Sequence, residues 1–527
     1  MSFLEFDCGC KVPIINGAPQ IDYYSLNLTC PTAWKIYQDG YTQSIFQLES
    51  YLGKTWSKKL KPSDIEDAAS LISIIRPGVL QAQDENGESL TKVFCDRKNS
   101  SWYPSSDIID NLLIKTYGIW CFQEQVMSVT KDLASFDGIL QNKLVKAIGK
   151  KQSDLLISLK KEFVKRCLEN KAASEKEAIT IFENIEKSGR YLFNKSHAVC
   201  YAVTGYWTAW AKSHFPKHYI CAWLRNAKNE QKPLEEIRAV VSEARRLGIK
   251  ILPPSVRNLP TTNFFIKRDA VHFGLDSIKG CGQKGVAKLT VTDTDFDSCS
   301  WMDFLVMLSP LTNRTQMVNM IRSGCFDYTE IDRSRCEYEY NQFALLSNNE
   351  VKLAQELYEK RTPLVLVKLI QDLKEEKKIS AKRKEVLASI IDSLINPSSS
   401  LKDSRENIIA HEKELMGINI SCSAMDKASI PEARNNCADI EKIENNKTVI
   451  LVGEITECRE IKIKNGKMAG ESMVTLQLLD TTGSCDCVIF PKELSFYEGG
   501  IYDGNIIMVK GKKNNRGGVI IEKVYEI

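Results

Sequence analysis

The sequence lacks several features that would assign the chain to a specialised class. Its 527 residues contain no apolar run of about 18 residues, so we expect no membrane span. The opening residues M-S-F-L-E-F-D-C-G-C have neither the basic nor the apolar segment of a secretory signal, which predicts a cytoplasmic protein. Seventeen irregularly spaced cysteines are typical of reduced thiols and not of a disulfide framework. A net charge of +4 is too small to indicate nucleic-acid binding by itself.

One cysteine pair near the beginning has the spacing of half a metal site. Cys8-Gly9-Cys10 is a Cys-x-Cys pair, and Cys30 follows it 20 residues later. A structural zinc site needs four ligands, and no matching second pair lies nearby in the sequence. We therefore interpret the pair as a chance occurrence and predict no metal ligands in this chain.

Acidic residues are absent from one long stretch, between Lys187 and Asn229, which contains seven Lys or Arg. Within it, 193–216 reads F-N-K-S-H-A-V-C-Y-A-V-T-G-Y-W-T-A-W-A-K-S-H-F-P and predicts a helix with Ser196 as N-cap and Pro216 as its end. The free N–H groups and the dipole of a helix N-terminus, joined by basic side chains, favour a polyphosphate ligand. The alternative is a core helix with a solvated basic rim. The apolar residues at helical spacing are Val199, Ala202, Val203, Tyr206, Trp207 and Trp210.

Four further polar motifs precede this helix. They are I-F-Q-L-E-S at 45–50, I-I-R-P-G at 74–78, Y-G-I-W-C-F-Q-E-Q-V-M at 117–127 and A-I-G-K-K at 147–151. Taken alone, each is a weak signal, because an Arg before Pro-Gly is usually a turn residue and adjacent lysines usually form a solvated face.

Together with F-N-K-S-H-A-x-x-Y at 193–201, these motifs resemble the fingers domain of the C family of DNA polymerases, the bacterial DNA polymerase III alpha subunits. In that family the 193–201 segment lies close to the incoming nucleotide. The resemblance implies that basic and polar residues of the motifs bind the deoxynucleoside triphosphate (dNTP) substrate. The candidate nucleotide-binding residues are Gln47, Arg76, Lys150, Lys151, Asn194, Lys195 and His197.

A glycine-containing turn between two helical patterns predicts a helix-hairpin-helix motif. The segment I-K-G-C-G-Q-K at 278–284 has two glycines that let the backbone approach a phosphate, which the exposed N–H groups can bind without reading bases. In the resembled family a tandem unit at this place grips duplex DNA. The candidate DNA-binding residues here are Lys279, Gly280, Gly282 and Lys284.

Two binding surfaces are expected further along. The pentapeptide Q-F-A-L-L at 342–346 fits the motif by which the family docks on the sliding clamp, with Gln342, Leu345 and Leu346 as its anchors. Five short alternating segments around 449–455, 473–479, 485–490, 506–510 and 518–525 predict an OB-fold barrel. Lys464 and Lys467 lie between the first two strands and are candidate DNA contacts.

The predicted fold class is multidomain α+β, with mainly helical fingers and a helix-hairpin-helix region followed by a C-terminal five-stranded OB-fold barrel. The expected organisation is an N-terminal segment, 1–30; fingers, 31–260; a helix-hairpin-helix and clamp-binding region, 261–400; a connecting segment, 401–446; and the OB domain, 447–527.

Nucleotidyl transfer by two metal ions needs grouped carboxylates, which this family holds in a palm domain preceding the fingers. No Asp-x-Asp segment occurs in that setting, so we predict no catalytic residue in this chain. The resemblance implies the C-terminal half of a split, phage-like DNA polymerase III alpha subunit that works in the host cytoplasm if the source is viral. Its Mg²⁺ would be held by a palm on another polypeptide, and its partners would be primer–template DNA, dNTP, that polypeptide and a sliding clamp. The alternative is a non-catalytic, clamp-docking DNA-binding replication factor.

Overall fold

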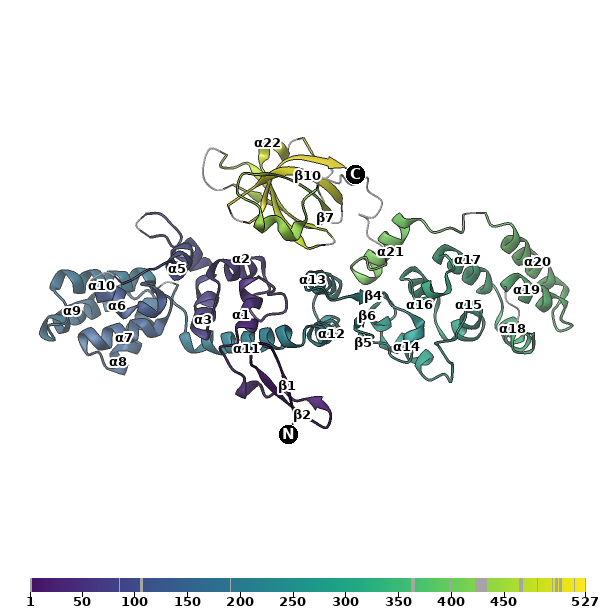
Figure 1. Ribbon diagram of the computed structural model, residues 1–527, viewed down its shortest axis with the longest axis horizontal. Coiled ribbons are helices and arrows are strands. Elements are labelled where there is room, and N and C mark those ends of the chain that lie inside the picture. The colour runs from purple at the N-terminus through teal and green to yellow at the C-terminus, as the bar shows by residue number, and fades with distance from the viewer. Residues whose placement is uncertain are drawn as a thin grey trace. The chain divides into compact units, whose positions relative to one another are not determined.

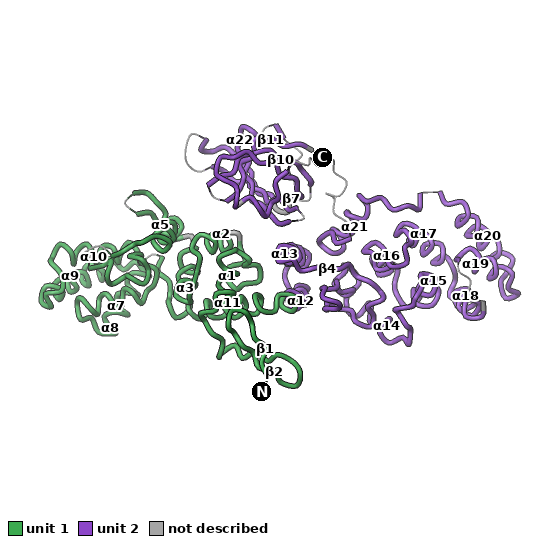
Figure 2. The backbone as a smooth tube through the Cα atoms, in the orientation of Figure 1, with its two compact units in different colours: residues 1–219 green, residues 220–527 purple. Residues whose placement is uncertain are grey.

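The computed structural model describes residues 2–526 except 85, 105–107, 190, 362–364, 399, 422–433, 464–467, 481, 495, 498–500, 502–504 and 516. The chain divides into two compact units, Met1–Tyr219 and Ile220–Ile527, which Figure 2 shows in different colours. Each unit has its own core and is described separately.

The first unit is a helical body with a small N-terminal sheet (Figure 1). The three-stranded antiparallel sheet has the order β1-β2-β3. Its strands and helices are β1 (Ser2–Glu5), β2 (Lys11–Ile15), β3 (Ala18–Pro19), α1 (Pro31–Gln38), α2 (Tyr51–Leu60), α3 (Ile65–Ile74), α4 (Pro77–Gln81), α5 (Leu90–Lys98), α6 (Ile108–Leu112), α7 (Gln123–Ala134), α8 (Gly138–Gly149), α9 (Ser153–Glu169), α10 (Glu175–Ser188) and α11 (Lys195–His214). Helix α12 (Pro216–Ala227) continues from this unit into the next.

Two hydrophobic clusters hold the first unit together. One is centred on α1, α3 and α11, where the rings of Trp34 and Tyr206 lie 4.8 Å apart between centroids. The other joins α7 through α10 around Phe163 and Phe182, whose ring centroids are 5.6 Å apart. The apolar face of α11 predicted from sequence is thus buried, with Ala202 and Trp210 each about 1% exposed.

A single lysine in the last turn of α11 is buried in this core. Lys212 is 1% exposed and donates hydrogen bonds to the carbonyl oxygens of Tyr41 (2.9 Å) and Gln43 (2.8 Å). Because these carbonyls take its charged donors, Lys212 fixes the loop before Ile45 and is not part of a solvated basic rim.

The second unit begins with helices around a small sheet of order β4-β6-β5. Its elements are α13 (Pro233–Arg246), β4 (Ile251–Leu252), β5 (Phe265–Lys267), β6 (Ala270–His272), α14 (Gln283–Thr290), α15 (Trp301–Asp303), α16 (Arg314–Arg322), α17 (Arg333–Phe343), α18 (Asn348–Arg361), α19 (Leu366–Glu375), α20 (Ala381–Ile395) and α21 (Arg405–Met416).

A buried ion pair fastens α17 to α21. The Arg333 guanidinium donates to Glu412 at 2.9 Å and to both carboxylate oxygens of Asp327, at 2.6 and 2.9 Å. Glu412, with a side chain 0% exposed, also accepts the backbone N–H groups of Ile420 and Ser421. Because both oxygens of the Glu412 carboxylate accept hydrogen bonds, this side chain holds the segment 420–421 that follows α21.

The C-terminal strands form a closed five-stranded barrel (Figure 1), which confirms the predicted OB-like fold. Around the barrel the order is β10-β11-β9-β8-β7, with β9 and β11 parallel and the other neighbours antiparallel. The strands are β7 (Thr448–Lys462), β8 (Ser472–Leu479), β9 (Ser484–Ile489), β10 (Ile506–Lys513) and β11 (Val519–Glu526), and α22 (Pro491–Leu494) lies between β9 and β10.

The predicted fold class, helical regions followed by a barrel, is confirmed. The unit boundary after Tyr219 differs from the predicted fingers boundary at 260, so the finer domain limits stay a prediction. Among the described helices, none combines the length and apolar character that crossing a bilayer requires.

Candidate functional site

The N-terminus of α11 begins two residues before the position expected from sequence. Asn194, not Ser196, is the N-cap, and its side-chain oxygen accepts the N–H of His197 at 2.8 Å. The N–H of Lys195 donates to the Glu124 carboxylate at 2.8 Å. Two of the four free N–H groups of the helix are therefore used internally, and the negative Glu124 offsets part of the dipole.

The Q-E-Q motif at 123–125 positions this helix start. Phe122 and Phe193 form a parallel bridge, in which the N–H of Phe193 donates to Cys121 O at 3.0 Å. Gln125 accepts the N–H groups of Cys121 and Phe122, both at 2.8 Å. Because each motif residue satisfies backbone groups, the motif acts as a brace that aligns the segment before α11 with the segment before α7.

Arg76 of the R-P-G motif lies directly on this segment. Its guanidinium carbon is 3.5 Å from the centroid of the Phe193 ring, a cation–π contact, and the residue is exposed. Gly78 allows Tyr191 to come close to this turn, because a Cβ atom on residue 78 would lie 2.9 Å from Tyr191 Cβ. The Pro-Gly turn thus brings Arg76 to the start of α11.

Four rings form a continuous line along the start of α11, which we call the aromatic ladder. The ring centroids are 5.2 Å apart for Phe193 and His197, 4.0 Å for His197 and Tyr201, and 4.9 Å for Tyr201 and Phe46. Arg76 covers the first ring, and Gln47 follows Phe46 in an exposed left-handed conformation with φ +70°. The ladder therefore connects the R-P-G, F-N-K-S-H and F-Q-L-E-S motifs.

The charge of Lys195, the first residue of α11, is paired with an acid at close range. Its Nζ lies 2.8 Å from Glu66 on α3 and 5.6 Å from the centroid of the Phe122 ring. The two side chains are 30% and 46% exposed, so solvent screens the pair. Sequence reasoning missed both Glu66 and Glu124, since the acid-free stretch gives no sign of acids supplied by other segments.

Lys150 and Lys151 belong to a different part of the first unit. Lys150 is the C-cap of α8, Lys151 has φ +54°, and both are exposed. Helix α8 packs in the α7–α10 cluster. Its Ile148 lies against Gly189 in the chain before α11, so closely that a Cβ atom on Gly189 would be 2.0 Å from Ile148 Cγ2. No interaction recorded for the described residues joins these lysines to the aromatic ladder, and Arg190 lies outside those residues.

The predicted helix-hairpin-helix turn is exposed and rigidly supported. Gly280 has φ +81°, and the Lys279 carbonyl before it accepts from Asn319 on α16 at 2.7 Å. Gly282 precedes α14 with open space around it, and Lys284 is exposed on the first turn of that helix. Lys279 is also exposed but pairs with Glu414 at 3.4 Å. The turn thus presents Gly280, Gly282 and Lys284 to solvent, whereas Cys281 between the glycines is buried and its N–H donates to Ile278 O at 2.9 Å.

The three predicted clamp anchors differ in exposure. Gln342 lies half-buried on α17, Leu345 is 56% exposed, and Leu346 is 8% exposed and packs in the core of the second unit. Docking through Leu346 would need this side chain to leave that core, and clamp binding stays a prediction. Lys464 and Lys467, the predicted barrel contacts, lie outside the described residues.

The described residues do not fit Mg²⁺. Their one converging group of three or more His, Cys, Asp or Glu side chains is Cys8, Cys10, Cys30 and His214. These are sulfur and nitrogen donors, whereas Mg²⁺ takes oxygen ligands. We therefore derive no catalytic step through Mg²⁺ from these residues.

A helical body with a cationic helix start is followed along the chain by a helix-hairpin-helix turn and an OB-like barrel, an order of elements typical of proteins that bind DNA. Comparison with known proteins agrees: the model of the bacterial DNA polymerase III alpha subunit finger domain matches residues 12–171, and a helix-hairpin-helix model matches residues 248–336. The chain is a relative of the C-family DNA polymerases, and it fits the C-terminal half of their alpha subunit.

Several relatives match nearly the whole chain, and others match part of it. The DNA polymerase III subunit alpha of Aquifex aeolicus is 29% identical over 508 residues, which cover 93% of this chain and 38% of that protein. The subunit of Bacillus subtilis is 26% identical over 504 residues, covering 94% and 41%. That of Haemophilus influenzae is 30% identical over 332 residues, covering 59% and 27%. The chain thus spans less than half the length of these relatives.

Proposed function

We propose that this chain provides the dNTP-binding fingers, the duplex grip and the OB-fold module of a template-directed DNA polymerase. The single observation that carries the proposal is the grouping of Arg76, Lys195 and His197 at the start of α11, where Arg76 covers the first ring of the aromatic ladder and His197 is its second. These three groups come from two segments that are more than 100 residues apart in the sequence. Their convergence beside the exposed His197 and the half-buried Phe193 suits a ligand with both a flat base and a charged phosphate chain.

In this proposal each group has a separate role. Arg76 and Lys195 neutralise the triphosphate, on which charge grows as pyrophosphate leaves. His197 donates a hydrogen bond to a phosphate oxygen, while Asn194 and Gln47 position the ligand. Lys150 and Lys151 extend the cationic surface toward the leaving group. The metal-binding carboxylates belong to a palm domain outside this sequence, because the model that matches here is that of the finger domain.

The helix-hairpin-helix turn grips the primer–template duplex in the same proposal. Lys284 and the exposed glycines Gly280 and Gly282 contact phosphates without reading bases. The barrel carries single-stranded template through Lys464 and Lys467, and a sliding clamp binds at 342–346. The match of the helix-hairpin-helix model to residues 248–336 supports the duplex grip.

The test combines nucleotide binding with primer extension. A dye-labelled dATP is titrated with the 527-residue chain and a primer–template whose next template base is dT, followed by extension assays after addition of a polypeptide carrying the palm. We expect the double variant Lys195→Ala/His197→Ala to weaken dATP binding at least tenfold and to raise KM. Lys161→Ala, which removes an exposed lysine from α9, is the matched control and should change neither.

Extension by the double variant with an unchanged KM would refute the roles assigned to Lys195 and His197. The alternative, a non-catalytic DNA-binding factor, predicts salt-sensitive duplex binding that no dNTP tightens even when the palm is present. A polymerase instead binds the primer–template more tightly with the correct dNTP than with an incorrect one.

A further inference from the structure

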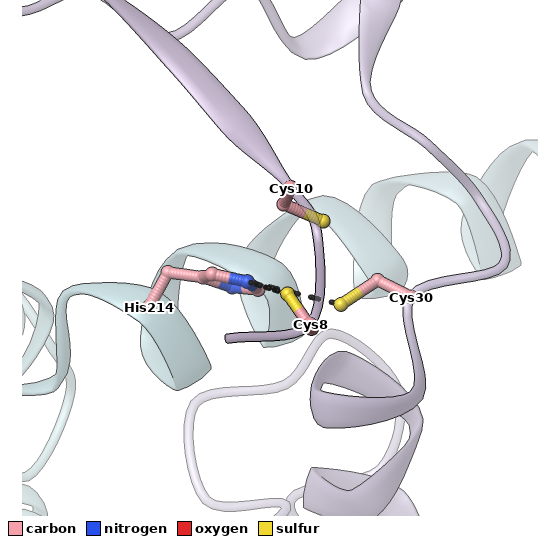
Figure 3. A group of neighbouring side chains, drawn as sticks. All are labelled: Cys8, Cys10, Cys30 and His214. Atoms are coloured by element: carbon pink, nitrogen blue, oxygen red, sulfur yellow. Dashed lines mark hydrogen bonds between the residues drawn. The ribbon is translucent and has the colours of Figure 1, made fainter. Parts of the chain in front are cut away.

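Three thiols and one imidazole meet at the end of α11 opposite the aromatic ladder. Cys8 and Cys10 lie in the turn between β1 and β2, Cys30 is the N-cap of α1, and His214 is the last residue of α11. Figure 3 shows the four side chains facing one another, and their candidate ligand atoms all lie within 4.8 Å of one another. We propose that Cys8, Cys10, Cys30 and His214 bind one zinc ion as a closed structural site.

The distances suit tetrahedral zinc. With Zn–S of about 2.3 Å and Zn–N of about 2.0–2.1 Å, neighbouring ligand atoms of a tetrahedron lie about 3.6–3.8 Å apart. The His214 Nε2 atom is 3.1 Å from Cys8 Sγ and 3.7 Å from Cys30 Sγ. These two pairs need shifts of only a fraction of an ångström to reach coordination, and all four ligand atoms lie within 4.8 Å of one another.

The imidazole of His214 is already oriented as a metal ligand. Its Nδ1 atom lies 3.0 Å from the carbonyl oxygen of Trp210, which can only accept, so Nδ1 carries the proton and Nε2 presents its lone pair to the thiols. The ring also stacks on Trp210, with centroids 4.2 Å apart and planes 16° apart, and meets Phe6 edge-on at 4.5 Å. A backbone carbonyl that fixes the tautomer is the usual outer partner of a zinc-bound histidine.

The backbone around the cysteines also favours one sulfur-lined pocket. Gly9 has φ +82°. The Phe6 carbonyl accepts the Gly9 N–H at 2.8 Å, and the Phe6 N–H donates to the Cys10 carbonyl at 3.0 Å. These two hydrogen bonds close a tight turn that carries Cys8 and Cys10. Cys30 faces this turn from the start of α1. Its own N–H is held by the Tyr206 hydroxyl on α11 at 3.1 Å.

The ligand chemistry selects the metal and its role. Three thiolates and one imidazole in tetrahedral arrangement suit Zn²⁺, whereas Mg²⁺ and Ca²⁺ require oxygen donors. Four protein ligands leave no open position for water or substrate, so the zinc is structural. It would fasten the β1–β2 hairpin to α1 and to the end of α11. The sequence alone did not reveal the site, because His214 lies 206 residues after Cys8.

The experiment measures zinc in the full 527-residue chain, purified without chelators, by plasma mass spectrometry. We expect one zinc per chain. Cobalt added to the metal-free chain should give the thiolate charge-transfer and visible bands of a tetrahedral site. Cys8→Ser, Cys30→Ser and His214→Gln should each lower the zinc content several-fold, and His214→Cys should restore it. Cys200→Ser, which removes an exposed thiol of α11 outside the cluster, is the matched control and should leave the content unchanged.

Several results would overturn the proposal. The wild-type chain could hold neither zinc nor tetrahedral cobalt, the three ligand variants could all retain zinc, or mass mapping could show a disulfide among Cys8, Cys10 and Cys30 in the native chain. If a ligand variant fails to fold, the cobalt spectrum of the wild-type chain still decides the question. None of these outcomes depends on nucleotide or DNA binding, so the zinc site and the proposed function are tested independently.

Discussion

Removing the charge of Lys195 while keeping its apolar stem tests the proposed triphosphate site most directly. The variant Lys195→Met keeps an unbranched apolar side chain and removes the ammonium, which lies 2.8 Å from Glu66 and 5.6 Å from the centroid of the Phe122 ring. A hydrogen bond from a charged donor to phosphate contributes about 1.5–3 kcal/mol. Since the Lys195–Glu66 pair is solvent-screened and is worth about 0.5 kcal/mol, the net loss on binding should be about 1–2.5 kcal/mol.

This loss corresponds to a roughly 5- to 70-fold weaker dissociation constant for a dNTP. The matched variant Glu66→Gln removes the acid that competes with the phosphate for Lys195, so dNTP binding should tighten about two- to fivefold. Both changes should shrink as salt is raised, because the side chains are partly exposed. Anisotropy of a labelled dNTP in the presence of primer–template measures each constant.

Two results would contradict this reasoning. If Lys195→Met binds dNTP within twofold of the unaltered chain, the ammonium does not contact the phosphates. If Glu66→Gln weakens binding as much as Lys195→Met, the ion pair holds α3 against α11 and has no direct role in ligand binding.

Three other predictions concern the second unit. Arg333→Ala leaves the fully buried Glu412 unpaired and should lower the free energy of unfolding by about 3–5 kcal/mol in urea titrations, whereas Arg335→Ala, which breaks an exposed pair, should cost less than about 1 kcal/mol. Lys284→Ala should reduce the slope of log Kd for duplex DNA against log salt by about 0.9, an effect that Lys161→Ala should not show. Burial alone would raise the pKa of Glu350, but hydrogen bonds from Arg383 and Ser347 outweigh it and lower that pKa below 4.5. Its contribution to stability should therefore be present at neutral pH and lost as the pH falls below about 4.5 through the folded-state pKa, and Glu350→Gln should abolish this part of the pH dependence of the urea midpoint.

Local signals predicted the elements of this chain better than their contacts. The five barrel strands follow from alternation and turn residues, and each observed strand overlaps its predicted range. The α11 helix follows from apolar periodicity, although its N-cap is wrong by two residues, because Asn194 and Ser196 both have suitable side chains. The fold shows how the first turn is satisfied: the Glu124 carboxylate accepts the Lys195 N–H, and the Asn194 side chain accepts the His197 N–H.

The candidate sites were harder to predict because their residues come together over long separations. Arg76 stacks on Phe193 across more than 100 residues, and the glutamate that holds the Lys195 N–H lies 71 residues away. Resemblance to a family supplied the motif that contains Glu124 but not the contact of Glu124 with Lys195, and it gave no sign of Glu66. Along the sequence, the Cys-x-Cys pair has no second pair of ligands nearby. In the fold, a hairpin turn and two helix ends bring the ligand atoms of Cys8, Cys10, Cys30 and His214 together.

Helix α11 carries the aromatic ladder at its N-terminal end and His214 at its C-terminal end. It is 20 residues long, so its ladder end and its His214 end are about 30 Å apart. Between them, Tyr206 holds the loop that carries Cys30, and Lys212 holds the carbonyls of Tyr41 and Gln43.

The loop that presents Gln47 is therefore fixed twice on the same helix. Lys212 fixes its beginning, and Tyr201 packs against its Phe46 ring at 4.9 Å. Gly205 lies between these two attachments, where a Cβ would be 3.0 Å from Tyr37 Oη and 3.5 Å from Phe46 O. The close approach leaves the loop little room to slide along α11. A zinc ion on His214 would act on this same arrangement, since it would fix α1 and the hairpin to the last turn of the helix that also carries Lys212. The metal site and the ladder would then be coupled through one rigid helix, without any contact between them.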